Sequence, residues 1–349
     1  YSCKMVETRQ VLVFTFLTLT SLTATTTAFD PYQPGPHNTT HIYISASDNP
    51  GLEEEIDVWV PTDIGLYPVF FFLSGLGGII PPIAYNEMFH HMASHGVAVV
   101  GPWSFSLPVN PVDKVPYLEG VINWAKVNLH KQLHMNGVSV GVVLNLANYI
   151  LGGHSSGAHV QVEYLKKSCG DVSGQVWLSP VDGMDPAGLL PIFCIEPGKY
   201  LNYGLPTLHL AAGYDTVPGA SGFACAPGEL SNLRFYDALH PEIASKWFIN
   251  ATRFAHADLL DQMFIETVEA TQFCGYNSEL TDEEHGVYRR YAAGQIVSFV
   301  KALYTVDEEK CSSYMAYLED PTLMTVQVEA QHSNLKGTCP KASCSWFHP

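Results

Sequence analysis

Short apolar runs of strand length recur along the chain, and segments with a helical pattern separate them. The first two runs, 41–47 and 54–61, alternate apolar and polar residues, which is typical of an antiparallel pair of strands with one exposed face. The later runs are continuously apolar, as expected for strands of a parallel sheet that is buried on both faces. These later runs are 68–74, 97–101, 149–153, 176–179, 207–213 and 246–251.

The segments between the runs are predicted as crossover helices at 84–94, 116–133, 158–167 and 284–304. Strands that alternate with helices predict an α/β fold, with a mostly parallel central sheet of about eight strands flanked by helices. No internal repeat and no linker rich in Pro, Gly or Ser divides the chain. We therefore expect one domain over residues 29–305, followed by a Cys-containing tail at 306–349.

The N-terminal segment has the layout of a secretory signal peptide. Arg9 precedes the apolar run 11–19, and small residues then lead to Ala28, after which we expect cleavage. The apolar run is shorter than the roughly 20 residues that span a bilayer, which favours a signal over a membrane anchor. We expect residues 1–28 to be leader and signal peptide, and the protein to be secreted with no stable membrane span.

The cysteines are consistent with an oxidising compartment. Of the eight, Cys3 lies in the leader, so pairing of the others would leave one unpaired. Their spacing fits no zinc module, and we expect disulfides rather than a metal site. Sequons for N-glycosylation at Asn38 and Asn250 also fit secretion. The remaining cysteines are Cys169, Cys194, Cys225, Cys274, Cys311, Cys339 and Cys344.

The charge balance excludes one class of partner. The chain has 17 Lys and Arg against 34 Asp and Glu, a formal net charge of −17, and no cluster of basic residues. A protein of this kind is not suited to a nucleic-acid backbone or an anionic membrane surface. With 47% hydrophobic and only 15% charged residues, the chain has ample material for a buried core.

The segment Gly153-His154-Ser155-Ser156-Gly157 follows a predicted strand and begins a predicted helix. In that context G-x-S-x-G predicts a nucleophile elbow, a tight turn that exposes a catalytic serine at the edge of the sheet. Side chains at the glycine positions would collide with the neighbouring strand and helix. Ser155 is therefore the candidate nucleophile; the alternative is a Gly-rich turn with a capping serine.

A serine nucleophile needs a base and a carboxylate that holds the base, and both are expected on loops after later strands. His256 follows the last predicted strand and is the candidate base. Asp215 follows the strand at 207–213 and is the candidate acid, while Asp182 and Asp185, after the preceding strand, are alternatives. Any of these aspartates could instead cap a turn.

An oxyanion hole requires two backbone N–H groups. One is expected from Ser156, directly after the nucleophile, and the other from the loop 74–78, most simply from Leu76. A dinucleotide-binding loop is the rival interpretation of these glycines, but the third glycine of that motif would fall at Ile80.

These motifs, in this order, resemble the chlorophyllases, within the chlorophyllase and cutinase-like α/β-hydrolases. The resemblance implies an α/β-hydrolase fold, no cofactor, and cleavage of carboxylic esters by a Ser-His-Asp triad, with Ser155 as nucleophile and His256 as base. It extends over about residues 52–304 and is carried by residues 68–75, Tyr85-Asn86, 91–102, 153–155, 180–183, 225–227 and 256–261.

Three positions depart from the usual chlorophyllase pattern. Ser74 replaces a histidine, the elbow continues as Ser-Gly-Ala158 rather than Arg-Gly-Gly, and Ser179 replaces an aspartate at the presumed acid position. The last change leaves both Asp182 and Asp215 open as the acid.

The sequence thus predicts a secreted serine carboxylesterase that acts on a hydrophobic small-molecule ester through an acyl-enzyme. The alternative is a hydrolase-fold protein that has lost catalysis and serves as a binding or structural component. Three apolar loops are predicted as candidate pocket walls, at 81–83, 103–105 and 189–193. His90, His91 and His95 are interpreted as a solvated helix face rather than a metal cluster.

Overall fold

The structure is a computed structural model, which describes residues 29–105, 110–183, 192–220, 222–332, 339–342 and 344–346. The predicted leader and signal peptide at 1–28 lies outside the described residues. The chain divides into two compact units, residues 1–30 and residues 31–349, and the architecture below is that of the second unit.

The described part of this unit is built on a nine-stranded mixed sheet in the order β1-β2-β4-β3-β5-β6-β8-β9-β10. The strands from β4 to β9 in that order pair in parallel, while β1, β2 and β10 pair antiparallel at the two ends. The bounds are β1 (Thr39–Ile44), β2 (Glu55–Pro61), β3 (Gly65–Leu73), β4 (Ala98–Trp103), β5 (Val142–His154), β6 (Val172–Leu178), β8 (Thr207–Ala212), β9 (Lys246–Ala251) and β10 (Val328–His332).

Every strand that the sequence predicts is present. The continuously apolar runs are the central parallel strands, and every residue of β6 and β8 is buried. This is the burial that strands covered on both faces require, and it is why their sequences lack alternation. The α/β prediction and the antiparallel opening pair β1 and β2 are confirmed.

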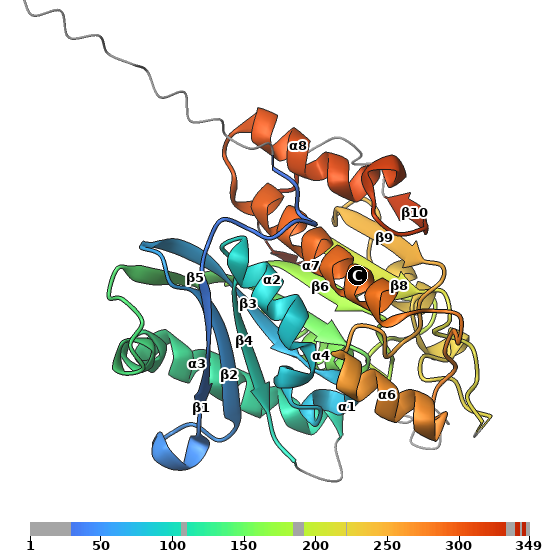
Figure 1. Cartoon of the computed structure of the whole chain (residues 1–349), viewed down its shortest axis with the longest axis horizontal. Helices are drawn as coiled ribbons and strands as arrows, with labels where there is room; N and C mark the ends of the chain where they lie inside the picture. The colour runs from blue at the N-terminus through green and yellow to red at the C-terminus, as the bar shows by residue number, and fades with distance from the viewer. Residues whose placement is uncertain are drawn as a thin grey trace, which may run out of the picture. The chain divides into compact units, whose positions relative to one another are not determined.

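Helices cover both faces of the sheet. Figure 1 looks onto the face where α2 and α7 pack against each other, while α3 and α4 pack together on the opposite face. All four correspond to predicted crossover helices. Their bounds are α2 (Asn86–Ser94), α3 (Pro111–Met135), α4 (Ser156–Leu165) and α7 (Asp282–Tyr304).

The histidines of α2 do not form a solvated face, so that expectation is wrong. His91 and His95 are buried, and their Nε2 atoms lie 2.7 Å from the carbonyl oxygens of Pro31 and Gln33. The N-terminal residues of this unit pack over the helix and supply these acceptors, which the periodicity of the helix alone cannot reveal.

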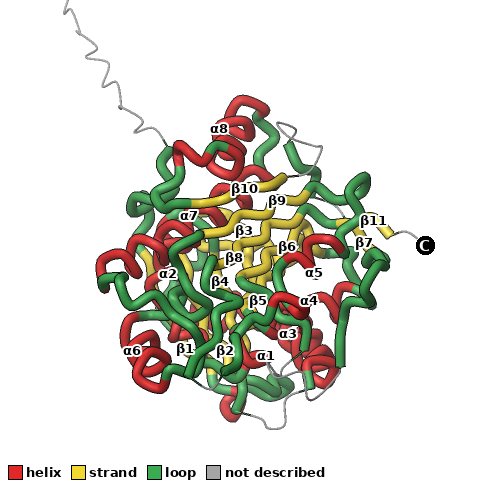
Figure 2. Tube along the Cα trace, turned by 90° about the vertical axis from the view of Figure 1, so that its right-hand side faces the viewer, coloured by secondary structure: helices red, strands yellow, loops and turns green. Residues whose placement is uncertain are grey.

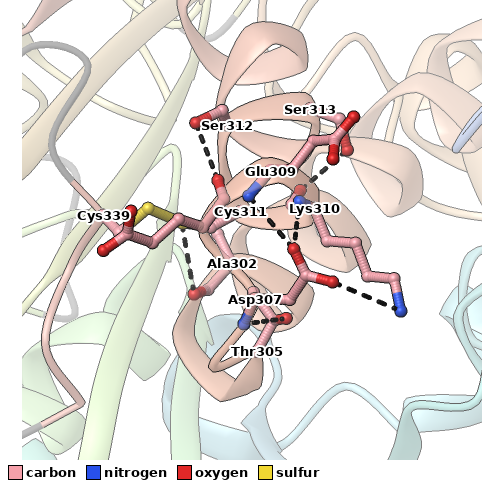
Figure 3. The surroundings of a disulfide bond; sticks show 10 residues. Ala302, Thr305, Asp307, Glu309, Lys310, Cys311, Ser312, Ser313 and Cys339 are labelled. Carbon is pink, nitrogen blue, oxygen red and sulfur yellow. Dashed lines mark hydrogen bonds and ion pairs between the residues drawn. A yellow bond between two sulfur atoms is a disulfide. The ribbon is translucent and has the colours of Figure 1, made fainter.

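The segment expected as a tail contributes to the fold. Helix α8 (Glu308–Glu319) packs against α7, and β10 pairs with β9, as Figure 2 shows where β10 lies beside β9. Asp307 caps α8, its side chain accepting from Glu309 N and Lys310 N, and Cys311 on this helix is joined to Cys339 (Figure 3). The last described strand, β11 (Ser345–Trp346), pairs with β7 (Tyr203–Gly204).

Short elements complete the description. Besides α8, two regular helices of the described residues were not predicted, α5 (Leu233–Asp237) and α6 (Gln262–Thr271). The turn after β3 is assigned as α1 (Gly75–Gly78), and 3-10 helices lie at η1 (Ala46–Asp48), η2 (Pro82–Tyr85), η3 (Gly228–Leu230) and η4 (Pro321–Leu323).

Three disulfides join six of the cysteines in the described residues. They are Cys169–Cys344, Cys225–Cys274 and Cys311–Cys339, and Cys194 is free and buried. This matches the predicted pattern of paired cysteines with one left over. Among the helices that the structure describes, none combines the length and apolarity that a membrane crossing requires.

Candidate active site

Ser155 occupies the turn between β5 and α4, as the motif predicts. Its backbone has φ 54° and ψ −131°, and its N–H donates to Leu178 O at 3.0 Å. The glycines permit this turn: a Cβ on Gly153 would lie 2.5 Å from Ala158 N, and one on Gly157 would lie 2.2 Å from Leu73 O. Strand, strained serine and helix together form the geometry of a nucleophile elbow.

His256 follows β9, and its ring lies against an aspartate from the neighbouring strand. Nδ1 of His256 lies 3.1 Å from Oδ1 of Asp215, and both side chains are buried. The turn that carries His256 is closed by Asp258, whose Oδ2 accepts from Ala255 N at 2.8 Å. The structure therefore brings the predicted base and the first of the predicted acids into direct contact.

The second oxygen of Asp215 is held by two donors. Oδ2 accepts from Ala212 N at 3.0 Å and from Asn232 Nδ2 at 2.9 Å. His209 Nε2 lies 3.2 Å from Asn232 Oδ1 and fixes the orientation of that amide, while burial lowers the pKa of His209 to about 4, which keeps its ring neutral. Oδ1 of Asp215 is thus directed at His256.

Asn232 was not predicted from the sequence. It lies 17 residues beyond Asp215 in an irregular segment, and its backbone has a positive φ of 39°. A single asparagine in a loop carries no sequence signal for such a role.

Asp182, the alternative acid, is engaged elsewhere. Its Oδ1 accepts from Cys194 N at 2.6 Å, and its Oδ2 accepts from Ile195 N at 3.2 Å and from Arg234 Nε at 2.7 Å. The carboxylate is completely buried and anchors the segment that follows β6. Asp185, the third aspartate considered, lies outside the described residues.

Asp182 also belongs to a buried group with His159 and Cys194 whose ligand atoms lie within 4.8 Å of one another. Two of the atoms that could bind a metal already accept hydrogen bonds, His159 Nδ1 from Gly183 N at 2.8 Å and Asp182 Oδ1 from Cys194 N at 2.6 Å. Burial lowers the pKa of His159 to about 4 and raises the pKa of the Cys194 thiol well above its usual value. We interpret this group as a buried polar cluster that supports the loop after β6.

The two predicted oxyanion residues line the same cavity as Ser155. Ser156 begins α4, and Leu76 lies in the turn after β3 with φ 54° and ψ 37°. Ser74, at a position where chlorophyllases usually have histidine, is buried and its Oγ donates to Ile80 O at 2.5 Å. The replacement thus closes the same turn that presents Leu76.

Ser155, Ser156, Leu76 and His256 line one cavity of about 160 Å³. Among the described residues, no Lys, Arg, Asp or Glu lines this cavity. The apolar loops at 81–83, 103–105 and 192–193 are not part of its wall, and 189–191 lie outside the described residues. Its wall is instead formed by Ile80, Val181, Ala257, Leu260, Val268, Phe273 and the Cys225–Cys274 disulfide, with Gly75 and His154.

Comparison with known proteins places this geometry in a family. The family model described as Chlorophyllase matches residues 25–334. The chain belongs to the chlorophyllase family. Similar curated chlorophyllases include Chlorophyllase-2 of Arabidopsis thaliana, 24% identical over 82% of this chain and 88% of the relative. Chlorophyllase type 0 of Chenopodium album is 25% identical over 80% and 78%, and Chlorophyllase-1, chloroplastic, of Citrus unshiu is 25% identical over 89% and 90%.

Chlorophyllases are carboxylic ester hydrolases, so membership of the family makes this chain an ester hydrolase with a small-molecule substrate. The mixed, mostly parallel sheet flanked by helices is consistent with the α/β-hydrolase fold that the resemblance implied.

Proposed function

We propose that the protein is a secreted serine esterase in which Ser155, His256 and Asp215 form the catalytic triad. The observation that carries this proposal is the 3.1 Å contact between His256 Nδ1 and Asp215 Oδ1, in a site where Ser155 and His256 line the same cavity. A serine at a strained elbow, a histidine and a buried carboxylate are the parts that nucleophilic acyl transfer requires.

In the first half-reaction, Ser155 Oγ attacks the ester carbonyl carbon and its proton passes to His256 Nε2. The carbonyl oxygen becomes an oxyanion that accepts hydrogen bonds from the backbone N–H groups of Leu76 and Ser156. Asp215 stabilises the imidazolium through Nδ1–H. His256 then protonates the leaving alcohol as the carbon–oxygen bond breaks, and the acyl group stays on Ser155.

In the second half-reaction, water donates a proton to His256 Nε2 and attacks the acyl carbon. The tetrahedral oxyanion uses the same two N–H groups, and its collapse releases the carboxylic acid. The proton on His256 returns to Ser155 Oγ, so the starting enzyme is restored without a cofactor.

The cavity favours a neutral, hydrophobic ester. Its wall is mostly aliphatic side chains, Phe273 and a disulfide, and the described lining includes no Lys or Arg that could pair with an anionic substrate. A volume of about 160 Å³ is similar to that of cavities that bind benzene, so it holds only the groups next to the reacting carbonyl. The relatives are named after chlorophyll, which is therefore one ester to assay, with its conversion to chlorophyllide as the direct readout.

We place the enzyme outside the cell. The signal-like segment at 1–28 motivates this proposal, and three disulfides in the described residues and the exposed Asn38 sequon support it. The second sequon does not add support, because the side-chain Oδ1 of Asn250 is buried in β9. N-terminal sequencing of protein recovered from the medium of expressing cells should start at Phe29; retention in the cells would contradict secretion.

The catalytic proposal is tested with Ser155→Ala and a matched control, Ser298→Ala. Ser298 is a buried serine of α7 whose hydroxyl has no hydrogen-bond partner within the described part. With p-nitrophenyl esters, we expect Ser155→Ala to lose at least about 10³-fold in kcat and Ser298→Ala to keep wild-type kcat. A fluorophosphonate probe should label wild type and the control only. Wild-type turnover in Ser155→Ala would overturn the mechanism, and a folded wild type that neither labels nor turns over would indicate the non-catalytic alternative.

A further inference from the structure

A buried chain of hydrogen bonds connects the turn after β3, which carries Leu76 and is called the oxyanion turn below, to the proposed base His256. Gly75 N donates to Tyr85 Oη at 3.2 Å, Tyr85 Oη lies 2.7 Å from His154 Nδ1, and His154 Nε2 lies 3.1 Å from the carbonyl oxygen of His256. The side chains of Tyr85, His154 and His256 are all buried. Gly75 and Tyr85 are ten positions apart in sequence, while Tyr85 and His154 are 69 apart and His154 and His256 are 102 apart.

The direction of each bond follows from the chemistry of the groups. Burial, and then the neighbouring His256, lower the pKa of His154 well below its usual value, so this ring is neutral. A carbonyl oxygen can only accept, and Nε2 of His154 therefore carries the proton. Nδ1 is then an acceptor, so Tyr85 donates its hydroxyl proton to His154 and accepts from Gly75 N–H. Burial raises the pKa of Tyr85, which keeps this hydroxyl protonated.

Three members of the hydrogen-bond chain, Gly75, His154 and His256, adjoin or belong to groups that the proposed mechanism uses. Gly75 immediately precedes Leu76, the oxyanion donor with positive φ, and His154 immediately precedes Ser155. At the other end, the bond to the His256 carbonyl fixes the backbone of the base, whose ring is held by Asp215. The rings of His154 and His256 also contact each other, with centroids 4.6 Å apart.

We propose that Tyr85 and His154 are positioning residues that hold the oxyanion turn, the nucleophile turn and the catalytic base in register. This inference rests on the proposed function, because it assigns a catalytic consequence to a hydrogen-bond chain that touches no reacting atom. Preorganised geometry is the requirement: a displacement of about 1 Å in a catalytic group can cost about 100-fold in rate.

The test uses substitutions that remove single links. Tyr85→Phe deletes the hydroxyl and keeps the ring, which packs against Phe72 and Phe89. His154→Phe deletes both links of the imidazole, and His154→Gln restores an N–H donor near the position of Nε2. The matched control is Tyr149→Phe, which removes a buried hydroxyl that pairs with Tyr164 Oη at 2.9 Å and does not line the cavity.

Each variant is titrated with a fluorophosphonate probe so that kcat refers to competent sites, and KM and the melting temperature are measured alongside. We expect Tyr85→Phe to lower kcat about 10-fold and His154→Phe about 100-fold, with KM within about 2-fold of wild type. His154→Gln should recover at least about 5-fold of the loss in His154→Phe. Tyr149→Phe should lower the melting temperature without changing kcat.

The outcomes separate this inference from the proposed function. If wild type lacks esterase activity, or Ser155→Ala keeps it, the proposed function fails and this inference fails with it. If Ser155→Ala is inactive but Tyr85→Phe keeps wild-type kcat per titrated site, only the positioning role is wrong. Should His154→Phe fail to fold, the comparison of Tyr85→Phe with Tyr149→Phe decides, because both remove one buried hydroxyl.

Discussion

At the scale of single residues, the site depends on backbone conformations that side chains disfavour. Ser155 and Leu76 both have φ 54°, and a non-glycine residue in such a region costs about 1–3 kcal/mol. Three backbone hydrogen bonds hold Ser155 in place: its own N–H donates to Leu178 O, and its carbonyl oxygen accepts from Val181 N and Ala158 N. Hydrogen bonds to the end of β6 and to the residues after it thus stabilise the strained turn that carries the candidate nucleophile.

Asp215 and Asp182 are expected to respond differently to the same substitution. Asp215→Asn removes the charge that holds His256 Nδ1–H, and kcat should fall about 10³- to 10⁴-fold with little change in unfolding free energy. Asp182→Asn removes one partner of the buried pair with Arg234 and should cost about 3–5 kcal/mol of stability, with kcat per titrated site unchanged.

Steady-state kinetics and denaturant unfolding of the two variants are the measurements. The reverse pattern, in which Asp182→Asn loses turnover and Asp215→Asn does not, would assign the acid to Asp182.

At the scale of elements, the loops that follow the parallel strands form the site. The Cys225–Cys274 disulfide joins the loop after β8, which carries Asp215, to the segment after α6. Backbone bonds strengthen this connection, from Ala226 N to Asp215 O and from Gly275 N to Val217 O, both at 3.1 Å. Both cysteines line the cavity, so the same covalent bond supports the acid loop and the apolar wall.

Removal of this disulfide should therefore affect both stability and catalysis. The double variant Cys225→Ser, Cys274→Ser opens a 49-residue loop, and Cys311→Ser, Cys339→Ser opens a 28-residue loop far from the cavity wall. Loop-closure entropy makes the cost of each roughly 4 kcal/mol. Only the first should also lower kcat/KM per titrated site, by about 10-fold, because its wall and acid loop loosen. Equal kcat/KM in the two variants would show that the Cys225–Cys274 disulfide does not contribute to catalysis.

At the scale of the whole molecule, buried ionisable groups make folding stability depend on pH. Asp258 is buried in the turn that carries His256, where its side chain accepts a hydrogen bond from Ala255 N. Its Oδ1 lies 3.8 Å from Nε2 of His285, and burial lowers the pKa of that histidine. Burial raises the pKa of Asp258 to about 7 from a usual 3.8. Between these values the folded protein keeps a proton that the unfolded chain has lost, so stability falls as pH rises from about 4 to about 7.

Asp258→Asn should remove this dependence. An asparagine can accept the same N–H from Ala255 and does not ionise, so the variant should unfold with a flatter pH profile than wild type. Relative to wild type, the unfolding free energy of the variant should rise by about 3 kcal/mol between pH 4 and pH 7. Urea unfolding across this range is the measurement, and parallel profiles for both proteins would contradict it.

Patterns of hydrophobicity predict the elements that bury apolar residues at regular positions along their length. The central strands and the four crossover helices do so, as the ten buried residues of α3 illustrate. Strand β10 was not predicted because it pairs with β9 alone at the end of the sheet, and α8 was not predicted because it buries few residues against α7. Such elements are defined by a neighbour that is distant in sequence, so their local pattern is weak.

The sequence by itself determined the α/β class, the elbow at Ser155 and the choice of His256, because each depends on a local pattern of glycines, apolar runs or position after a strand. Only the tertiary structure showed that Asp215, and not Asp182, contacts His256. The reason is the strand order β5-β6-β8-β9: β8 is the direct neighbour of β9, so Asp215 meets His256, whereas Asp182 follows β6, one strand further away. The buried bonds from Tyr85 to His154 and from Asn232 to Asp215 join parts of the chain far apart in sequence, and no local pattern encodes such contacts.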